Sequence, residues 1–183
     1  STVDPVVLDL LLRAGRTWLQ GIAGAEGDPA RVDSARVLFE RVLARDPQNP
    51  GAIAGIGYVL NISFIRGWDV PGLTPAEVQA RADSLNRLAM SRDSTLLNSW
   101  NMVLINRLYL EDDFEGAREA IERMVSLDPG YAEGYRDRGI YRQELEGDLK
   151  GALEDFQRSV DLDPSVQRLN SLAAGLMAAR RYP

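Results

Sequence analysis

Apolar residues recur at steps of three and four residues along most of the chain, which is the spacing of one face of an α-helix. Two clear sets, 35 positions apart, are Phe114, Ala117, Ile121, Met124 and Val125, and then Leu149, Ala152, Leu153, Phe156 and Val160. The pattern therefore predicts amphipathic helices that each bury one face. The distance between the two sets also suggests that the helices belong to a repeat.

Three kinds of residue mark this repeat. Four amphipathic stretches are closed by Asp46-Pro47, Asp93-Ser94, Asp128-Pro129 and Asp163-Pro164. Twelve residues before the second member of each pair lie Ala35, Ala82, Ala117 and Ala152, and six residues after it lie Ile53, Trp100, Tyr135 and Asn170. All three slots step together by 47, 35 and 35 residues. Coincident spacing of this kind predicts four copies of one structural element.

Each repeat is expected to fold as a helical hairpin. Proline stops a helix because it has no N–H and disfavours helical geometry in the residue before it. Turn residues lie in the middle of two repeats, at Asp112-Asp113 and at Glu146-Gly147-Asp148. The sequence thus predicts hairpins at about 5–46, 50–93, 97–128 and 132–163, and a final helix at about 166–180.

The second repeat is 12 residues longer than the following ones, and the extra residues fall between Leu60 and Thr74. Thr74, Pro75 and Glu77 mark the start of the next helix, with an N-cap, a first-position proline and a capping-box glutamate. The inserted segment carries Phe64, Ile65, Arg66, Trp68 and Val70. It has two interpretations: a binding loop that contacts a partner through Arg66 and Trp68, or a segment that folds back and plugs the hairpin end.

These slots resemble the tetratricopeptide repeat, whose pattern includes a central alanine, an aromatic residue four positions later and a closing proline. Ala152, Phe156 and Pro164 follow it, whereas Leu104, Asn86 and Ser94 depart from it. The resemblance implies an all-α fold, a right-handed α-α superhelix or solenoid of about four hairpins plus a C-terminal helix. We expect residues 1–183 to form a single array that is part of a longer protein.

The resemblance further implies a protein-protein interaction scaffold that binds a peptide or partner protein on the concave face, which the first helix of each hairpin lines. Helical phase places one set of candidate contacts there: Tyr58, Asn61, Asn98, Asn101, Ile105, Tyr109, Arg136, Ile140 and Gln143. Asparagine suits this role because its amide both donates to and accepts from a peptide backbone. For Ile105, Tyr109 and Ile140, packing between neighbouring hairpins is an equal alternative.

A second resemblance concerns the first half of the chain. The segments LeuLeuLeuArgAlaGlyArg and AlaArgValLeuPheGluArgValLeuAlaArgAspPro, with the Trp-containing insertion, look like the repeat segments of bacterial winged-helix regulators, adenylate cyclases and kinases. The alternative function is therefore a regulatory or sensory segment of such a protein. A winged-helix, cyclase or kinase domain in the flanking sequence would support it.

The composition of the chain argues against several kinds of catalytic, metal and nucleic-acid-binding site. It contains no cysteine and no histidine, which excludes thiolate nucleophiles, Cys/His zinc sites and histidine-based triads. We expect no enzymatic activity, no cofactor and no metal. The sequence pI of about 4.8 and the lack of a basic stripe argue against nucleic acid as a partner. Acidic residues concentrate between residues 111 and 165, as solvated helix faces or as a site for basic peptides.

Long apolar runs are missing from the sequence, so no membrane span is predicted in this chain. The sequence does not decide the compartment, because a lack of cysteine is compatible with both the cytoplasm and the periplasm. We favour the cytoplasm slightly. The final helix is rich in leucine and alanine and contains arginines but no acidic residue. We expect it to pack against a further helix or to mediate self-association.

Overall fold

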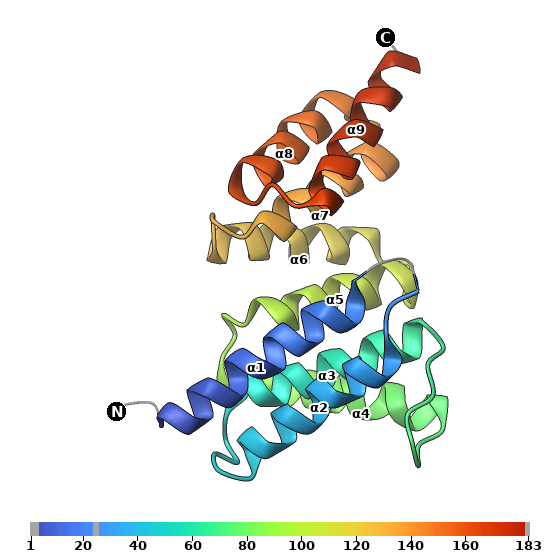
Figure 1. Ribbon diagram of the computed structural model, residues 1–183. Helices are drawn as coiled ribbons and strands as arrows, with labels where there is room; N and C mark the ends of the chain where they lie inside the picture. The colour runs from blue at the N-terminus through green and yellow to red at the C-terminus, as the bar shows by residue number, and fades with distance from the viewer. Residues whose placement is uncertain (1–3, 24–25, 182–183) are drawn as a thin grey trace. The chain divides into compact units, whose positions relative to one another are not determined.

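The computed structural model describes residues 4–23 and 26–181, and all regular secondary structure within these residues is helical (Figure 1). The helices follow one another without a strand among these residues, so the predicted all-α, solenoid-type fold is confirmed. The chain divides into two compact units, Ser1–Met102 (unit 1) and Val103–Pro183 (unit 2). The single array of residues 1–183 stays a prediction.

Unit 1 contains two complete hairpins. The first pairs α1 (Pro5–Ile22) with α2 (Pro29–Leu43), and the second pairs α3 (Pro50–Ile65) with α4 (Pro75–Arg92) (Figure 1). A fifth helix, α5 (Leu97–Tyr109), begins in unit 1 and ends in unit 2.

Each of the four helices of these hairpins begins with a polar N-cap residue that is followed by proline. The side chains of Asp4, Asp28 and Asn49 accept backbone hydrogen bonds of 2.8, 3.0 and 2.9 Å. Thr74 and Glu77 form the predicted capping box at the start of α4. Proline suits the first position because its missing N–H would have no partner inside the helix.

The core of unit 1 forms where small and aromatic residues alternate between helices. Ala35 and Ala82, two of the repeat alanines, are fully buried. Phe39 of α2 packs directly onto Gly55 of α3, where a Cβ atom would lie 2.5 Å from the end of the ring. The glycine therefore lets α3 approach α2 closely.

The inserted segment differs from the prediction at its beginning. We expect a connection from residue 61 onward, but α3 continues to Ile65, so the connection spans only residues 66–74. Asn61 and Ser63 are buried in the helix, and the Ser63 hydroxyl donates to the Val59 carbonyl at 2.9 Å. The helix continues because the apolar residues after Leu60 keep the helical phase of α3.

Unit 2 contains α6 (Phe114–Leu127), α7 (Ala132–Tyr141), a π-helical turn η1 (Arg142–Glu146), α8 (Leu149–Leu162) and α9 (Val166–Arg181). Both α6 and α8 end at an aspartate with extended backbone, Asp128 and Asp163, as expected for residues that precede proline. Phe156 of α8 lies between Gly139 of α7 and Gly175 of α9, where added Cβ atoms would lie 2.6 and 2.8 Å from its ring. This contact joins three helices in one layer of packing.

Candidate interaction surface

The first helices of the hairpins are neighbours in unit 1. The rings of Trp18 in α1 and Tyr58 in α3 have centroids 5.0 Å apart. The Tyr58 hydroxyl donates to Oδ1 of Asn101 in α5, with an oxygen–oxygen distance of 2.9 Å. These two contacts connect α1, α3 and α5 in a row, the arrangement that a surface lined by first helices requires.

The predicted contacts in unit 1 differ in their access to solvent. Asn98 is exposed at the start of α5, and Tyr58 is half-buried. Asn101 is 6% exposed and Asn61 is 1% exposed, so the structure places both amides within the packed interior of unit 1. Solvent reaches Asn98 and part of Tyr58, but not Asn61. Helical phase predicts that these residues lie on one face of their helices. It does not predict that Asn61 and Asn101 are buried while Asn98 is exposed.

A cluster of charged residues occupies the first helices of unit 2. The guanidinium group of Arg136 in α7 donates to Glu133 at 2.5 Å and to Asp137 at 3.0 Å. Arg168 in α9 contacts the other oxygen of Glu133 at 3.2 Å and also pairs with Asp163 at 2.8 Å. Glu133 thereby bridges two first helices. The positive charge of Arg136 is already balanced within the protein, so Arg136 is a weak candidate for binding an acidic group.

Burial shifts the pKa values of two groups in and beside this cluster, Asp137 and Tyr131. Together with the nearby Glu133 carboxylate, it raises the pKa of the Asp137 carboxyl group to about 7, although Arg136 acts against the shift. Burial likewise raises the pKa of the Tyr131 hydroxyl above its ordinary value. The cluster is thus a densely packed polar layer between helices rather than a set of freely solvated charges.

The other predicted contacts in unit 2 lie on α5, α7 and the π-helical turn. Ile105 and Ile140 are half-buried, as packing between hairpins would leave them, whereas Tyr109 is 71% exposed. Gln143 in the π-helical turn has a buried Oε1 atom with no hydrogen-bond partner among the described residues. Tyr109 is therefore the most accessible of the predicted aromatic contacts.

The connection after α3 packs back onto unit 1. Trp68 is half-buried against the core, together with Phe64, Val70 and Leu73. The Arg66 guanidinium lies over the Trp68 ring, 5.0 Å from its centroid, and both side chains crowd Gly27, where a Cβ would lie 2.8 Å from Trp68. This geometry favours the plug interpretation over a binding loop for Arg66 and Trp68.

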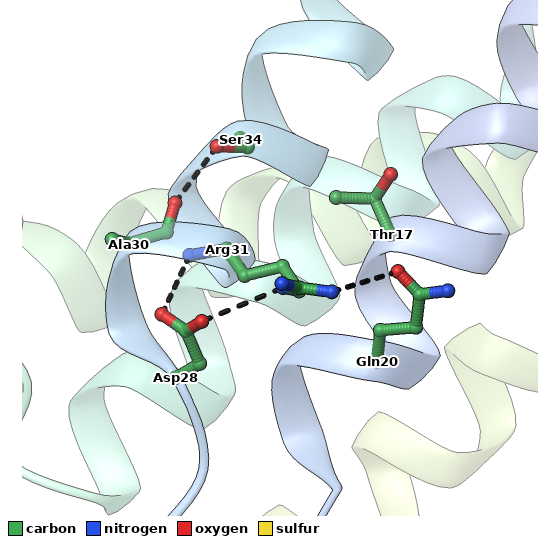
Figure 2. A pocket seen from close by; sticks show the side chains of 6 residues that line it. All are labelled: Thr17, Gln20, Asp28, Ala30, Arg31 and Ser34. Atoms are coloured by element: carbon green, nitrogen blue, oxygen red, sulfur yellow. Dashed lines mark hydrogen bonds and ion pairs between the residues drawn. The ribbon is translucent and has the colours of Figure 1, made fainter.

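A shallow polar depression that the sequence does not predict lies between α1 and α2 (Figure 2). It has a volume of about 310 Å³ and is lined by Thr17, Gln20, Asp28, Ala30, Arg31 and Ser34. Arg31 is held by Gln20 at 2.9 Å and by Asp28 at 3.4 Å, so its charge is balanced. Helical phase alone does not show such a site, because it depends on the angle between two helices.

The described residues offer neither of two other kinds of site. No group of three or more acidic side chains among them is arranged to hold a metal ion. Within the same part of the chain, none of the helices combines the length and apolar character needed to cross a membrane. Asp113, in the acidic turn before α6, instead caps that helix by accepting from the Gly116 N–H at 2.9 Å.

Comparison with known proteins finds a family that matches part of the chain. Residues 104–178 match the tetratricopeptide repeat family. Among solved structures, a thermophilic tetratricopeptide repeat protein of Thermus thermophilus is 18% identical with a TM-score of 0.65, over 94% of this chain and 82% of that chain. PilF of Pseudomonas aeruginosa is 18% identical with a TM-score of 0.62, over 97% of this chain and 70% of that chain.

A third similar structure is MamA of Desulfovibrio magneticus RS-1, which is 13% identical with a TM-score of 0.51, over 98% of this chain and 94% of that chain. Identities this low show a shared fold alone. No curated protein matches the sequence.

Proposed function

We propose that this chain, whose repeats are of the tetratricopeptide kind, is a scaffold that binds a peptide or partner protein on the surface lined by its first helices. Tetratricopeptide repeat proteins are commonly protein-protein interaction scaffolds and are generally not enzymes. Their partners are proteins or peptides.

The row Trp18–Tyr58–Asn101 is the observation that carries this proposal. It aligns three first helices, and the exposed Asn98 lies one helical turn before Asn101 on the same side of α5. Asn98 offers both a donor and an acceptor to the backbone of an extended peptide. The Tyr58 ring, held between Trp18 and Asn101, offers a rigid aromatic edge next to it. A rigid aromatic group beside an adaptable amide is a common composition of protein-binding surfaces.

Unit 2 carries candidate contacts of its own. The exposed ring of Tyr109 and the half-buried Ile105 and Ile140 provide apolar contact, while Gln143 provides a carbonyl oxygen without a partner among the described residues. A donor from a bound chain would satisfy this oxygen, which otherwise costs free energy where it is buried. Glu133 holds α7 and α9 together through Arg136 and Arg168.

The test uses peptides selected from a random display library against the whole chain. Their dissociation constants are then measured by fluorescence anisotropy for the wild type, Asn98→Ala and Tyr58→Phe. We expect Asn98→Ala to weaken binding roughly three- to tenfold, as the loss of one hydrogen bond to the peptide predicts. Tyr58→Phe should weaken binding by a smaller factor, because the hydrogen bond that it removes lies within the protein. Tyr58→Phe keeps the aromatic ring and removes only the hydroxyl that holds Asn101.

Gln157→Ala is the matched control, because it removes an exposed amide from the second helix α8. Far-UV circular dichroism shows that each variant remains folded. If the selected peptides bind Asn98→Ala and Tyr58→Phe as tightly as they bind the wild type and the Gln157→Ala control, the first helices are not the binding surface.

A further inference from the structure

Three large apolar side chains are exposed where the hairpins of unit 2 turn from their first to their second helices. Leu110 follows α5, Phe114 begins α6, and Leu145 lies in the π-helical turn η1. They are 39, 45 and 46% exposed, and we call them the apolar edge. Leu110 and Leu145 are 35 residues apart, so they occupy the same slot of successive repeats. A single exposed leucine is normal, whereas apolar positions that recur on neighbouring hairpins form a patch.

Hydrogen bonds bring the residues of the apolar edge to one end of the hairpins. The Asp113 N–H donates to the Arg107 carbonyl at 2.8 Å, which turns the start of α6 back beside the end of α5. The Tyr141 hydroxyl donates to the Phe114 carbonyl at 3.0 Å, so the end of α7 is held against the start of α6. Leu145 follows one turn after Tyr141. The patch therefore extends over two successive hairpins of unit 2.

The helices that follow the apolar edge in the chain leave it exposed. Helix α8 packs on α7 and on the π-helical turn, and α9 packs on α7 and α8. The exposed fractions of Leu110, Phe114 and Leu145 are those that remain with both helices in place. A packed neighbour within unit 2 is thus present on this side, and the apolar edge faces away from it.

Acidic residues surround the apolar edge. The segments 110–115 and 144–148 contain seven acidic residues and no basic one: Glu111, Asp112, Asp113, Glu115, Glu144, Glu146 and Asp148. Arginines pair with Glu111, Asp113 and Glu115. Asp112, Glu144 and Glu146 are exposed and form no ion pair among the described residues. Their negative charge is available to a partner.

An apolar patch inside a negative rim favours a partner that is both apolar and basic. Burial of leucine or aromatic side chains against the patch supplies free energy, and lysine or arginine beside them neutralises the rim. We propose that the apolar edge is a second docking site of this chain. It binds a basic segment of a partner protein, in which leucine or aromatic side chains lie between lysines or arginines.

The charge of the rim also argues against other occupants. Two copies of the chain that met through this edge would bring Asp112, Glu144 and Glu146 close to the same three residues of the other copy, and such like-charge contacts are costly. Nucleic acid and anionic membrane surfaces are repelled for the same reason. Of the two interpretations of the acidic region, solvated faces and a site for basic peptides, the second therefore applies at this edge.

Defined peptides test the chemistry of the partner. The probe is a short fluorescein-labelled peptide of lysine and leucine, with leucine at every third or fourth position. One control peptide has glutamate in place of lysine, and the other has serine in place of leucine. By fluorescence anisotropy, we expect the whole chain to bind the probe at least about tenfold more tightly than either control. Binding should weaken as salt is added, because exposed charges are screened. Equal binding of the probe and the glutamate peptide would reject the proposal.

Two double variants test the place of binding. Leu110→Ser, Leu145→Ser removes apolar contact, and Glu144→Lys, Glu146→Lys reverses charge at exposed positions. Each should weaken binding of the probe roughly tenfold.

Matched double variants away from the edge serve as controls. Leu19→Ser, Leu88→Ser changes two leucines that are 64 and 41% exposed, and Asp69→Lys, Asp161→Lys reverses two exposed acidic residues. Both should bind the probe like the wild type, and circular dichroism checks that all four variants are folded. If the two edge variants bind as tightly as their controls, the apolar edge is not the site.

Three further results would overturn the assignment. Loss of probe binding in Asn98→Ala would place the probe on the surface of the first helices, which shares no residue with the apolar edge. Self-association in sedimentation that Leu145→Ser abolishes would make a second copy the occupant. Cosedimentation with phosphatidylcholine vesicles that Leu110→Ser, Leu145→Ser abolishes would make it a lipid surface. We expect Asn98→Ala to bind the probe like the wild type, so this site and the proposed first-helix surface can fail independently.

Discussion

Asp112 has a left-handed backbone, with φ of 52°, and is the one non-glycine residue with positive φ in the described part of the chain. It follows α5 at the position that Gly147, with φ of 70°, occupies 35 residues later. Both residues end a first helix and precede an N-capping aspartate, Asp113 or Asp148. The same turn is thus made once with glycine and once with a residue for which it is strained.

Replacing Asp112 by glycine should therefore stabilise the protein. We expect Asp112→Gly to raise the free energy of unfolding by about 0.5–1 kcal/mol, because glycine adopts this conformation without Cβ strain. Urea unfolding followed by circular dichroism measures the change. Gly147→Asp makes the reverse change and should lower the stability by a similar amount; a destabilised Asp112→Gly variant would contradict the strain at this turn.

The largely buried Asp137 makes stability depend on pH. Its folded pKa of about 7 lies above its ordinary value of 3.8, so the folded protein binds a proton that the unfolded chain releases. The contribution of this group to stability is complete below about pH 4 and is lost as the pH rises to about 7. We expect Asp137→Asn to lose less stability than the wild type between about pH 5 and pH 8 in urea unfolding. Parallel pH profiles of the two proteins would show that Asp137 is not responsible.

At the scale of the helices, one extra residue in each of the later repeats explains the turn between their first and second helices. The usual tetratricopeptide repeat has about 34 residues, whereas the later repeats here have 35. The additional residue lies at the end of the first helix, where the Asp113 N–H donates to the Arg107 carbonyl at 2.8 Å and the Asp148 N–H to the Arg142 carbonyl at 2.9 Å. These wide turns absorb the insertion, so that the second helix still starts in phase with the core.

Glycines decide how closely the helices approach. Gly55→Ala should lower the free energy of unfolding by about 1–3 kcal/mol, because the new Cβ would lie 2.5 Å from the Phe39 ring. Gly15→Ala in α1 is the control, since nothing lies within 4 Å of its Cβ position. That variant should gain about 0.5–1 kcal/mol from helix propensity alone. Equal effects of both substitutions on the thermal midpoint would reject the close contact.

Across the whole chain, each compact unit has its own core. All three tryptophans, Trp18, Trp68 and Trp100, belong to unit 1, whereas circular dichroism reports on helices of both units. Phe156→Ala removes the ring that packs between α7, α8 and α9 and should cost about 3–5 kcal/mol. We expect its unfolding transition to shift more by circular dichroism than by tryptophan fluorescence, as in other repeat proteins with local coupling. Equal shifts of the transition by circular dichroism and by tryptophan fluorescence would indicate that units 1 and 2 unfold together.

Local sequence signals account for the helices, the hairpins and their repeat. Caps, prolines and the repeat alanines act over a few residues, and Ala35, Ala82, Ala117 and Ala152 are all buried as their slot predicts. The beginning of the insertion is the exception. Repeat length places it directly after Leu60, whereas no proline or turn residue stops α3 there, and the helix runs on to Ile65.

The accessibility of the polar residues on the first helices depends instead on tertiary packing. Asn98 and Asn101 share one helix face, yet Asn101 is buried where it accepts from Tyr58, and Asn98 stays exposed. Likewise, Arg138 meets Asp155, 17 residues later, through paired hydrogen bonds of 2.9 and 2.7 Å. Such contacts depend on the distance and angle between helices that are remote in sequence, which local patterns of polar and apolar residues do not encode.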